Sequence, residues 1–193
     1  MLGLKLETDP RWVNIAEKEI GEILTDHAYC EQKAASTCIS LILQFYQYPE
    51  ITEAVAPVVS EEWAHFRMVI AELKKRNLSL GEPRPDRYVT ELLKLERKGG
   101  QLTRQLMDRL LICALIEARS CERFRLLSMH CSDRLLRNFY HEFMVSEAGH
   151  YVLFVELAKK FRPEDEVNNR LQDLLIKEAE ITRSLEPRSD RIH

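Results

Sequence analysis

The sequence predicts an all-α protein: a four-helix bundle with extra short helices and a C-terminal helix. Apolar residues recur at steps of three and four over four long stretches, which is the period of a half-buried helix. The chain holds only 6 Gly and 7 Pro, too few for a fold with many β-turns. Its 193 residues, 45% of them hydrophobic, are enough to bury one core, so we expect a single domain over residues 1–193.

The first long helix is expected at about 20–47. Asp9 and Pro10 have the residue types of a helix start, an N-cap followed by a proline, so a short helix comes before it. Pro49 marks its end, because the residue before a proline is pushed out of the α region. Its buried face is expected to hold Leu24, Ala28, Ala34, Ala35, Cys38, Leu41, Ile42 and Phe45.

The second long helix is expected at about 50–77. Pro57 lies inside it, removes one backbone hydrogen bond and should kink the helix. Residues 78–86 contain one Gly and two Pro and are expected to form a loop. A short helix should follow at about 87–98, before the Gly pair at 99–100.

Two further long helices are expected at about 101–130 and 132–161. Pro163 then opens a last helix at about 164–185, whose acidic first turn suits the positive end of the helix dipole. The inward face of the helix at 101–130 is expected to hold Leu110, Cys113 or Ala114, Glu117, Cys121 and Phe124.

A Glu-x-x-His motif lies in the second and in the fourth predicted long helix. Residues three apart share a helix face, so the carboxylate and the imidazole of each motif can bind one metal ion. The first and third helices each carry a Glu in their apolar stripe, where a carboxylate is costly unless it is paired or metal-bound. Two such pairs of helices are the ligand arrangement of a di-metal carboxylate bundle. The six candidate ligands are Glu31, Glu62, His65, Glu117, Glu147 and His150.

Glu122 is the alternative to Glu117 in the third long helix. Glu117 and Glu147 lie at about equal separations in sequence from the expected turn near 131–133, one before it and one after it. In an antiparallel hairpin this puts Glu117 and Glu147 at one height, whereas Glu122 would be about 7 Å from that level. We therefore prefer Glu117 as the ligand.

The ligand types favour iron or manganese over zinc, which prefers fewer and softer ligands. Bridging carboxylates would hold two ions about 3.5–4 Å apart, and a reduced di-iron pair can activate dioxygen. The ligand set alone does not choose between ferroxidase, catalase, reductase, desaturase and hydroxylase. The sequence contains no flavin or nicotinamide motif, so the electrons for such a reaction should come from another protein.

Composition excludes several other classes. The net charge of −3 gives no overall basic field, so a nucleic-acid partner would need a local patch. The five cysteines are odd in number and contain no Cys-x-x-Cys pair, which indicates buried reduced thiols rather than a disulfide framework. No apolar run is long enough to span a membrane and the N-terminus does not read as a signal peptide, so we expect a cytoplasmic protein without a membrane partner.

Two kinds of polar residue could support a metal site of this type: basic residues that bind a substrate, and residues that orient the ligand histidines. Basic side chains gather between the second and third long helices, either as a solvated face or as phosphate contacts; the first candidates are Arg84, Arg87, Lys94, Arg97 and Lys98. A second basic set is Arg119, Arg123, Arg125, Arg134 and Arg137. Ligand histidines usually donate their other N–H to a carboxylate or carbonyl, and the candidates near the motifs are Asp26, Glu61 and Ser146.

Over nearly its whole length the sequence resembles the tRNA 2-methylthio-isopentenyladenosine hydroxylases of the MiaE type, which have a ferritin-like bundle. The strongest matching pieces are residues 25–35 (TDHAYCEQKAA), 61–66 (EEWAHF), 117–124 (EARSCERF), 146–151 (SEAGHY) and 189–193 (SDRIH). The iron ligands of that family fall on the six residues named above. The resemblance implies two iron ions, dioxygen as co-substrate, an external ferredoxin or reductase, and hydroxylation of the isopentenyl group of an adenosine next to the anticodon of tRNA.

Other readings stay open at this point. A ferritin-like iron-handling protein or another di-iron oxidoreductase would use the same ligands, and a large shell of subunits would favour the former. In a non-catalytic helical interaction module, the Glu and His pairs would lie on the surface. Protein from iron-rich medium would then contain no iron or manganese.

Overall fold

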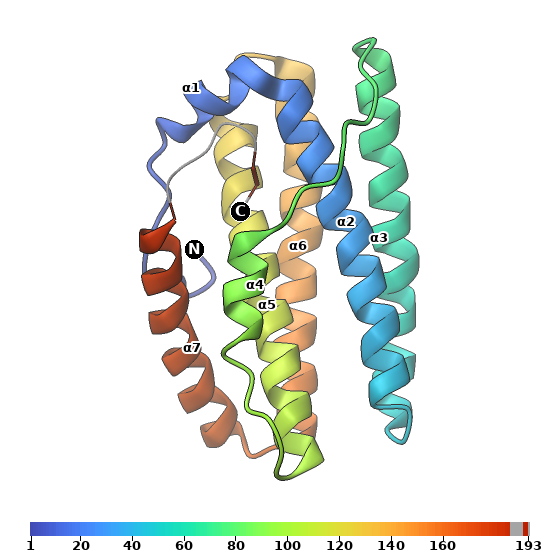
Figure 1. Ribbon diagram of the computed structural model, residues 1–193, viewed down its shortest axis with the longest axis vertical. Helices are drawn as coiled ribbons and strands as arrows, with labels where there is room; N and C mark the ends of the chain where they lie inside the picture. Colours follow the sequence, from blue (N-terminus) through green and yellow to red (C-terminus); the bar gives the residue numbers. More distant parts are fainter. Residues whose placement is uncertain (186–190, 193) are drawn as a thin grey trace. The chain divides into compact units, whose positions relative to one another are not determined.

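The computed structural model describes residues 1–185 and 191–192 (Figure 1). Ser189, Asp190 and His193 of the closing sequence lie outside the described residues. Every regular element in the described part is a helix, which confirms the all-α prediction. The described residues form two compact units: residues 1–13 with 86–185, and residues 14–85 with 191 and 192. The expectation of one domain over residues 1–193 stays a prediction.

The unit of residues 14–85 is built on a helical hairpin. Helix α1 (Trp12–Ala16) and a 3-10 turn (Glu17–Glu19) lead into α2 (Ile20–Gln44), and α3 (Pro49–Lys75) returns alongside it (Figure 1). Pro49 takes the first helical position, where its missing N–H costs nothing. The helix continues through Pro57.

Helix α3 ends in a Schellman motif. Asn77 has a positive φ of 57°, in the left-handed region that asparagine tolerates. Its N–H donates to the carbonyl of Lys74, and the N–H of Leu78 donates to the carbonyl of Leu73. These bonds satisfy carbonyls that the helix end would otherwise leave open, and they begin the predicted loop.

The described part of the unit of residues 1–13 and 86–185 contains the four helices α4 to α7. Helices α5 (Leu102–His130) and α6 (Arg134–Phe161) form a hairpin, against which α4 (Arg87–Leu93) and α7 (Glu164–Ser184) pack (Figure 1). Asp133 caps α6 by accepting hydrogen bonds from two backbone N–H groups of the first turn. Helix α4 is shorter than predicted. The chain after it is held by Asp108, which accepts hydrogen bonds from the backbone N–H and the guanidinium of Arg97.

Helix α5 is the most buried helix of this unit, with 19 of its 29 residues in the core. Helix α6 covers one side, where Phe124 stacks on Tyr140 with 5.5 Å between ring centroids. Helices α4 and α7 cover other sides. The sequence pattern predicted only the inward stripe, because the remaining faces of α5 carry polar side chains that are paired with distant residues.

Two of these buried polar residues correct the second basic set. Arg119 is 1% exposed and binds Glu122 and Glu178. The guanidinium of Arg123 lies 4.3 Å from the ring centroid of Trp12, and burial lowers its pKa to about 10. Neither a solvated face nor a phosphate contact fits these two arginines, because both are buried.

Candidate metal centre

Each hairpin places its candidate ligands at one height. Glu31 precedes Phe45, where α2 ends, by the same number of residues as Glu62 follows Tyr48, where α3 begins. At a rise of about 1.5 Å per residue, both carboxylates are about 21 Å from the turn. The α5–α6 hairpin repeats this spacing, because Glu117 lies as far before Cys131 as Glu147 lies after Asp133.

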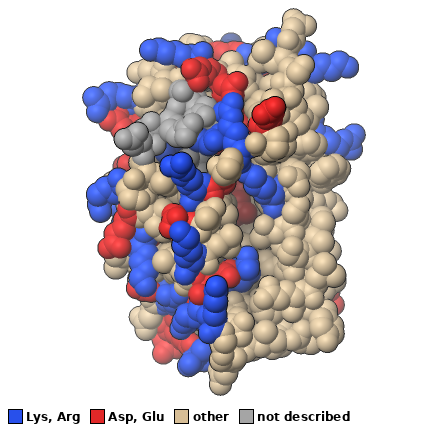
Figure 2. Space-filling view, viewed as in Figure 1, with Lys and Arg blue, Asp and Glu red and all other residues tan. Residues whose placement is uncertain are grey.

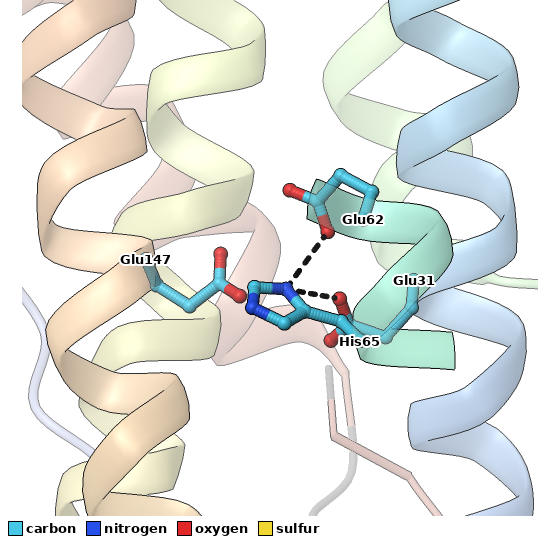
Figure 3. A group of neighbouring side chains, drawn as sticks. All are labelled: Glu31, Glu62, His65 and Glu147. Atoms are coloured by element: carbon cyan, nitrogen blue, oxygen red, sulfur yellow. Dashed lines mark ion pairs between the residues drawn. The ribbon is translucent and has the colours of Figure 1, made fainter. Parts of the chain in front are cut away.

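The α2–α3 hairpin brings Glu31, Glu62 and His65 together (Figure 3). The Nδ1 atom of His65 lies 3.3 Å from Oε2 of Glu31 and 3.5 Å from Oε2 of Glu62. The side chains of Glu31 and Glu62 are 4% and 1% exposed, and that of His65 is 11% exposed. This group is therefore a buried cluster of two carboxylates and one imidazole.

The α5–α6 hairpin holds a second cluster of the same composition, formed by Glu117, Glu147 and His150. Each residue offers one ligand atom, and these atoms lie within 4.8 Å of one another. The Nδ1 atom of His150 lies 3.8 Å from Oε2 of Glu147. In both hairpins, then, it is Nδ1 that faces the glutamate of the Glu-x-x-His motif.

The donor atoms of both clusters fit a metal ion. A carboxylate oxygen and an imidazole nitrogen bind iron or zinc at roughly 2.1 Å, so two atoms on one ion are at most about 4.2 Å apart. The atoms within each cluster need only small shifts to reach that range. The two buried carboxylates of each cluster would otherwise repel each other in a medium that screens charge poorly, and a cation would remove that cost.

His27 contacts Glu31 of this cluster, although it is not one of the six candidate ligands. Its side chain is fully buried, and Nε2 lies 2.8 Å from Oε1 of Glu31. The signal in the sequence was the spacing of four residues, which puts His27 and Glu31 on one face of α2.

The three residues expected to orient a ligand histidine have different surroundings. Asp26 is buried and accepts a hydrogen bond from the backbone N–H of Ile192 at 2.8 Å. Glu61 is half-exposed, with Oε1 at 4.0 Å from Nε2 of His65, which is beyond hydrogen-bond range. Ser146 is half-buried on α6. Their role as orienting residues stays a prediction.

The cysteines do not compete for this chemistry. All five are free, and four of them are buried. Burial raises the pKa of Cys113 to about 12 and that of Cys121 to about 12. A thiol with such a pKa stays protonated near neutral pH and is a poor ligand or nucleophile.

The first basic set is only partly available for phosphate contacts. Arg84 pairs with Glu22, and Lys94 pairs with Glu91 at 2.6 Å. Arg97 pairs with the buried Asp108 at 2.7 Å, which gives it a structural role. Arg87 and Lys98 are exposed. Figure 2 shows Lys and Arg side chains interleaved with Asp and Glu over α4 and α7, so this surface has mixed charge.

Comparison with known proteins identifies the relatives of this chain. Residues 2–193 match the family described as tRNA-(MS[2]IO[6]A)-hydroxylase (MiaE). The chain is 33% identical over 177 residues to the tRNA 2-(methylsulfanyl)-N(6)-isopentenyladenosine(37) hydroxylase of Pseudomonas putida (strain KT2440), covering 92% of this chain and 85% of the relative. It is 30% identical over 190 residues to the protein of the same name from Salmonella typhimurium (strain LT2), covering 74% of this chain and 69% of the relative.

A solved structure gives the fold. The chain is similar to a Synechococcus protein described as having aldehyde deformylating oxygenase activity, with a TM-score of 0.92 and 33% sequence identity. The match covers 98% of this chain and 94% of that protein. The ferritin-like prediction is thereby confirmed. None of the described helices is long and apolar enough to cross a membrane.

Proposed function

This chain belongs to the MiaE family of tRNA hydroxylases, and we propose that it hydroxylates the isopentenyl group of isopentenyladenosine, with or without the 2-methylthio group, next to the anticodon of tRNA. The reaction uses dioxygen and electrons from a ferredoxin- or reductase-type protein. Because tRNA is modified inside the cell, the protein acts in the cytoplasm.

The observation that carries this proposal is the pair of matching clusters. Each compact unit supplies two buried glutamates and one buried histidine at the same height of a hairpin. Each cluster by itself has two carboxylates and one imidazole, which is half of the ligand set of a di-iron centre in a ferritin-like bundle. The proposed ligands are Glu31, Glu62, His65, Glu117, Glu147 and His150.

When bound, two iron ions supply the oxygen activation that no amino-acid side chain can provide. The chain's own residues do the rest. The glutamates would neutralise the charge of the ions, and His65 and His150 would each offer a nitrogen ligand from their own hairpin. The buried surroundings keep water away from the centre, which protects a strong oxidant from side reactions.

Nucleoside analysis of cellular tRNA tests the proposed reaction. In a strain that lacks the gene, the hydroxylated isopentenyladenosine should disappear and its unhydroxylated precursor should accumulate in equal amount. Expression of the wild-type chain should restore the product, and expression of a His65→Ala variant should not. An unchanged nucleoside profile in the deletion strain would contradict the proposal.

The likeness to the Synechococcus structure supports a second candidate reaction, oxygen-dependent deformylation of an aldehyde by the same centre. The purified, iron-loaded protein can be supplied with a reductant, dioxygen and either a long-chain aldehyde or isopentenyladenosine in a tRNA anticodon stem-loop. Product from the stem-loop and none from the aldehyde is the outcome that we expect.

We also propose that tRNA contacts the first basic set. Of its members, Arg87, Lys94 and Lys98 are exposed and lie in one compact unit. Changing these three to glutamate should weaken tRNA binding and reduce the slope of log Kd against log salt by about 2–3. Each phosphate contact releases counterions when tRNA binds, so the loss of three contacts lowers the number of ions released. Filter binding at several salt concentrations measures this. Iron content and oxidation of the free nucleoside should stay unchanged.

The matched control changes Arg125, Arg134 and Lys160 to glutamate, which alters the net charge equally at three other positions outside the first basic set. We expect the control to keep the wild-type salt slope. If instead only the control variant loses tRNA binding, the RNA docks near the ends of α5 and α6 and the first basic set is a solvated face.

A further inference from the structure

His27 contacts a proposed ligand from within the same helix. Its Nε2 atom lies 2.8 Å from Oε1 of Glu31, which comes four residues later on α2. The His27 side chain is fully buried, and that of Glu31 is 4% exposed. The two atoms are at ion-pair distance, and water does not compete for either partner in this buried setting.

The second oxygen of Glu31 has a different neighbour. Oε2 lies 3.3 Å from Nδ1 of His65, so the two oxygens of one carboxylate face two different histidines. We propose that His27 is a positioning residue for Glu31. With a proton on Nε2 it attracts Oε1, fixes the rotation of the carboxylate and leaves Oε2 as the oxygen that would bind the metal ion. This inference rests on the proposed function, because it requires Glu31 to be a ligand.

The α5–α6 hairpin has no histidine at the matching position. Cys113 lies four residues before Glu117, and burial raises its pKa to about 12. A neutral thiol is a weak hydrogen-bond donor and cannot fix the Glu117 carboxylate as firmly. The two clusters therefore share their ligand types but differ in how the helix supports the first glutamate. The ion bound by α2 and α3 should be the more firmly held of the two.

The rate at which the protein releases iron shows whether His27 positions Glu31 or only fills space in the core. The protein is loaded with Fe(II) in the absence of oxygen and mixed with an excess of a ferrous chelator. From His27→Leu, one of the two iron ions should leave about 10-fold faster or more than from the wild type, which is the usual effect of removing a residue that orients a ligand. His27→Gln keeps an N–H donor and should restore much of the slow release. Cys113→Ala is the matched control and should release both ions at the wild-type rates.

Two outcomes would overturn the inference. One is wild-type release from His27→Leu. The other is equal acceleration of both ions in His27→Leu and His27→Gln, together with a lower melting temperature of the metal-free variants, which would assign His27 to packing alone. Wild-type protein that binds no iron would contradict the proposed function itself and the inference with it, so the two failures can be told apart.

Discussion

Replacement of His65 or of His150 by alanine is expected to reduce iron from about two ions per chain to one or fewer and to abolish hydroxylation. Each imidazole faces the carboxylates of its own cluster through Nδ1, so each variant removes the nitrogen ligand of one ion. Helix content should stay nearly unchanged, because alanine is a strong helix former. Metal analysis, circular dichroism and single-turnover assays measure the three quantities.

His141 provides the matched control for these variants. It lies on α6, like His150, but its side chain is exposed. His141→Ala should keep two iron ions and full activity. Two iron ions in His65→Ala or in His150→Ala would refute the assignment of that histidine as a ligand.

The pair Glu117→Gln and Glu122→Gln should separate binding of metal from stability of the fold. Both side chains are buried on α5, with exposures of 6% and 4%. Glu117→Gln should lose iron and activity, because it removes a charged ligand from the cluster. Glu122→Gln should keep two iron ions, because the Glu122 carboxylate binds Arg119 and the N–H and hydroxyl of Thr8.

Loss of the Glu122 charge leaves the buried Arg119 with one carboxylate partner fewer. Breaking a buried pair in this way costs about 3 kcal/mol, which lowers the melting temperature by roughly 6–12 °C in a chain of this size. Calorimetry of the metal-free variants measures this shift. If Glu122→Gln loses iron while Glu117→Gln retains it, Glu122 and not Glu117 is the ligand on α5.

The helix boundaries could be predicted closely because particular residue types, such as proline and N-cap aspartate, mark the helix ends in the sequence. Pro49 begins α3, Asp133 caps α6, and Pro163 precedes α7, each within a few residues of the expected boundary. Helix α4 was predicted too long. The helix ends at Leu93, and the chain after it contacts Asp108 through Arg97, 11 residues away in sequence, which no local pattern reports.

The candidate ligands could be predicted because metal binding requires fixed spacing on helices. The residues around them could not. Arg119 and Glu122 have the residue types of a solvated helix face, and they are buried because Thr8 and Glu178 reach them from distant parts of the chain. His27 lies about one helical turn from both Cys30 and Glu31, and helical spacing does not show which of the two its side chain will contact.

If iron is the metal that these clusters hold, the buried carboxylates would also connect iron supply to the lifetime of the protein in the cell. Without a bound cation, the two carboxylates of each cluster lie in the middle of long helices, where their repulsion favours local opening of that hairpin. Proteases cleave a chain in proportion to the time that it spends open. In iron-starved cells we therefore expect the unloaded chain to be degraded, so that its abundance follows the availability of the metal and tRNA hydroxylation falls without any change in transcription.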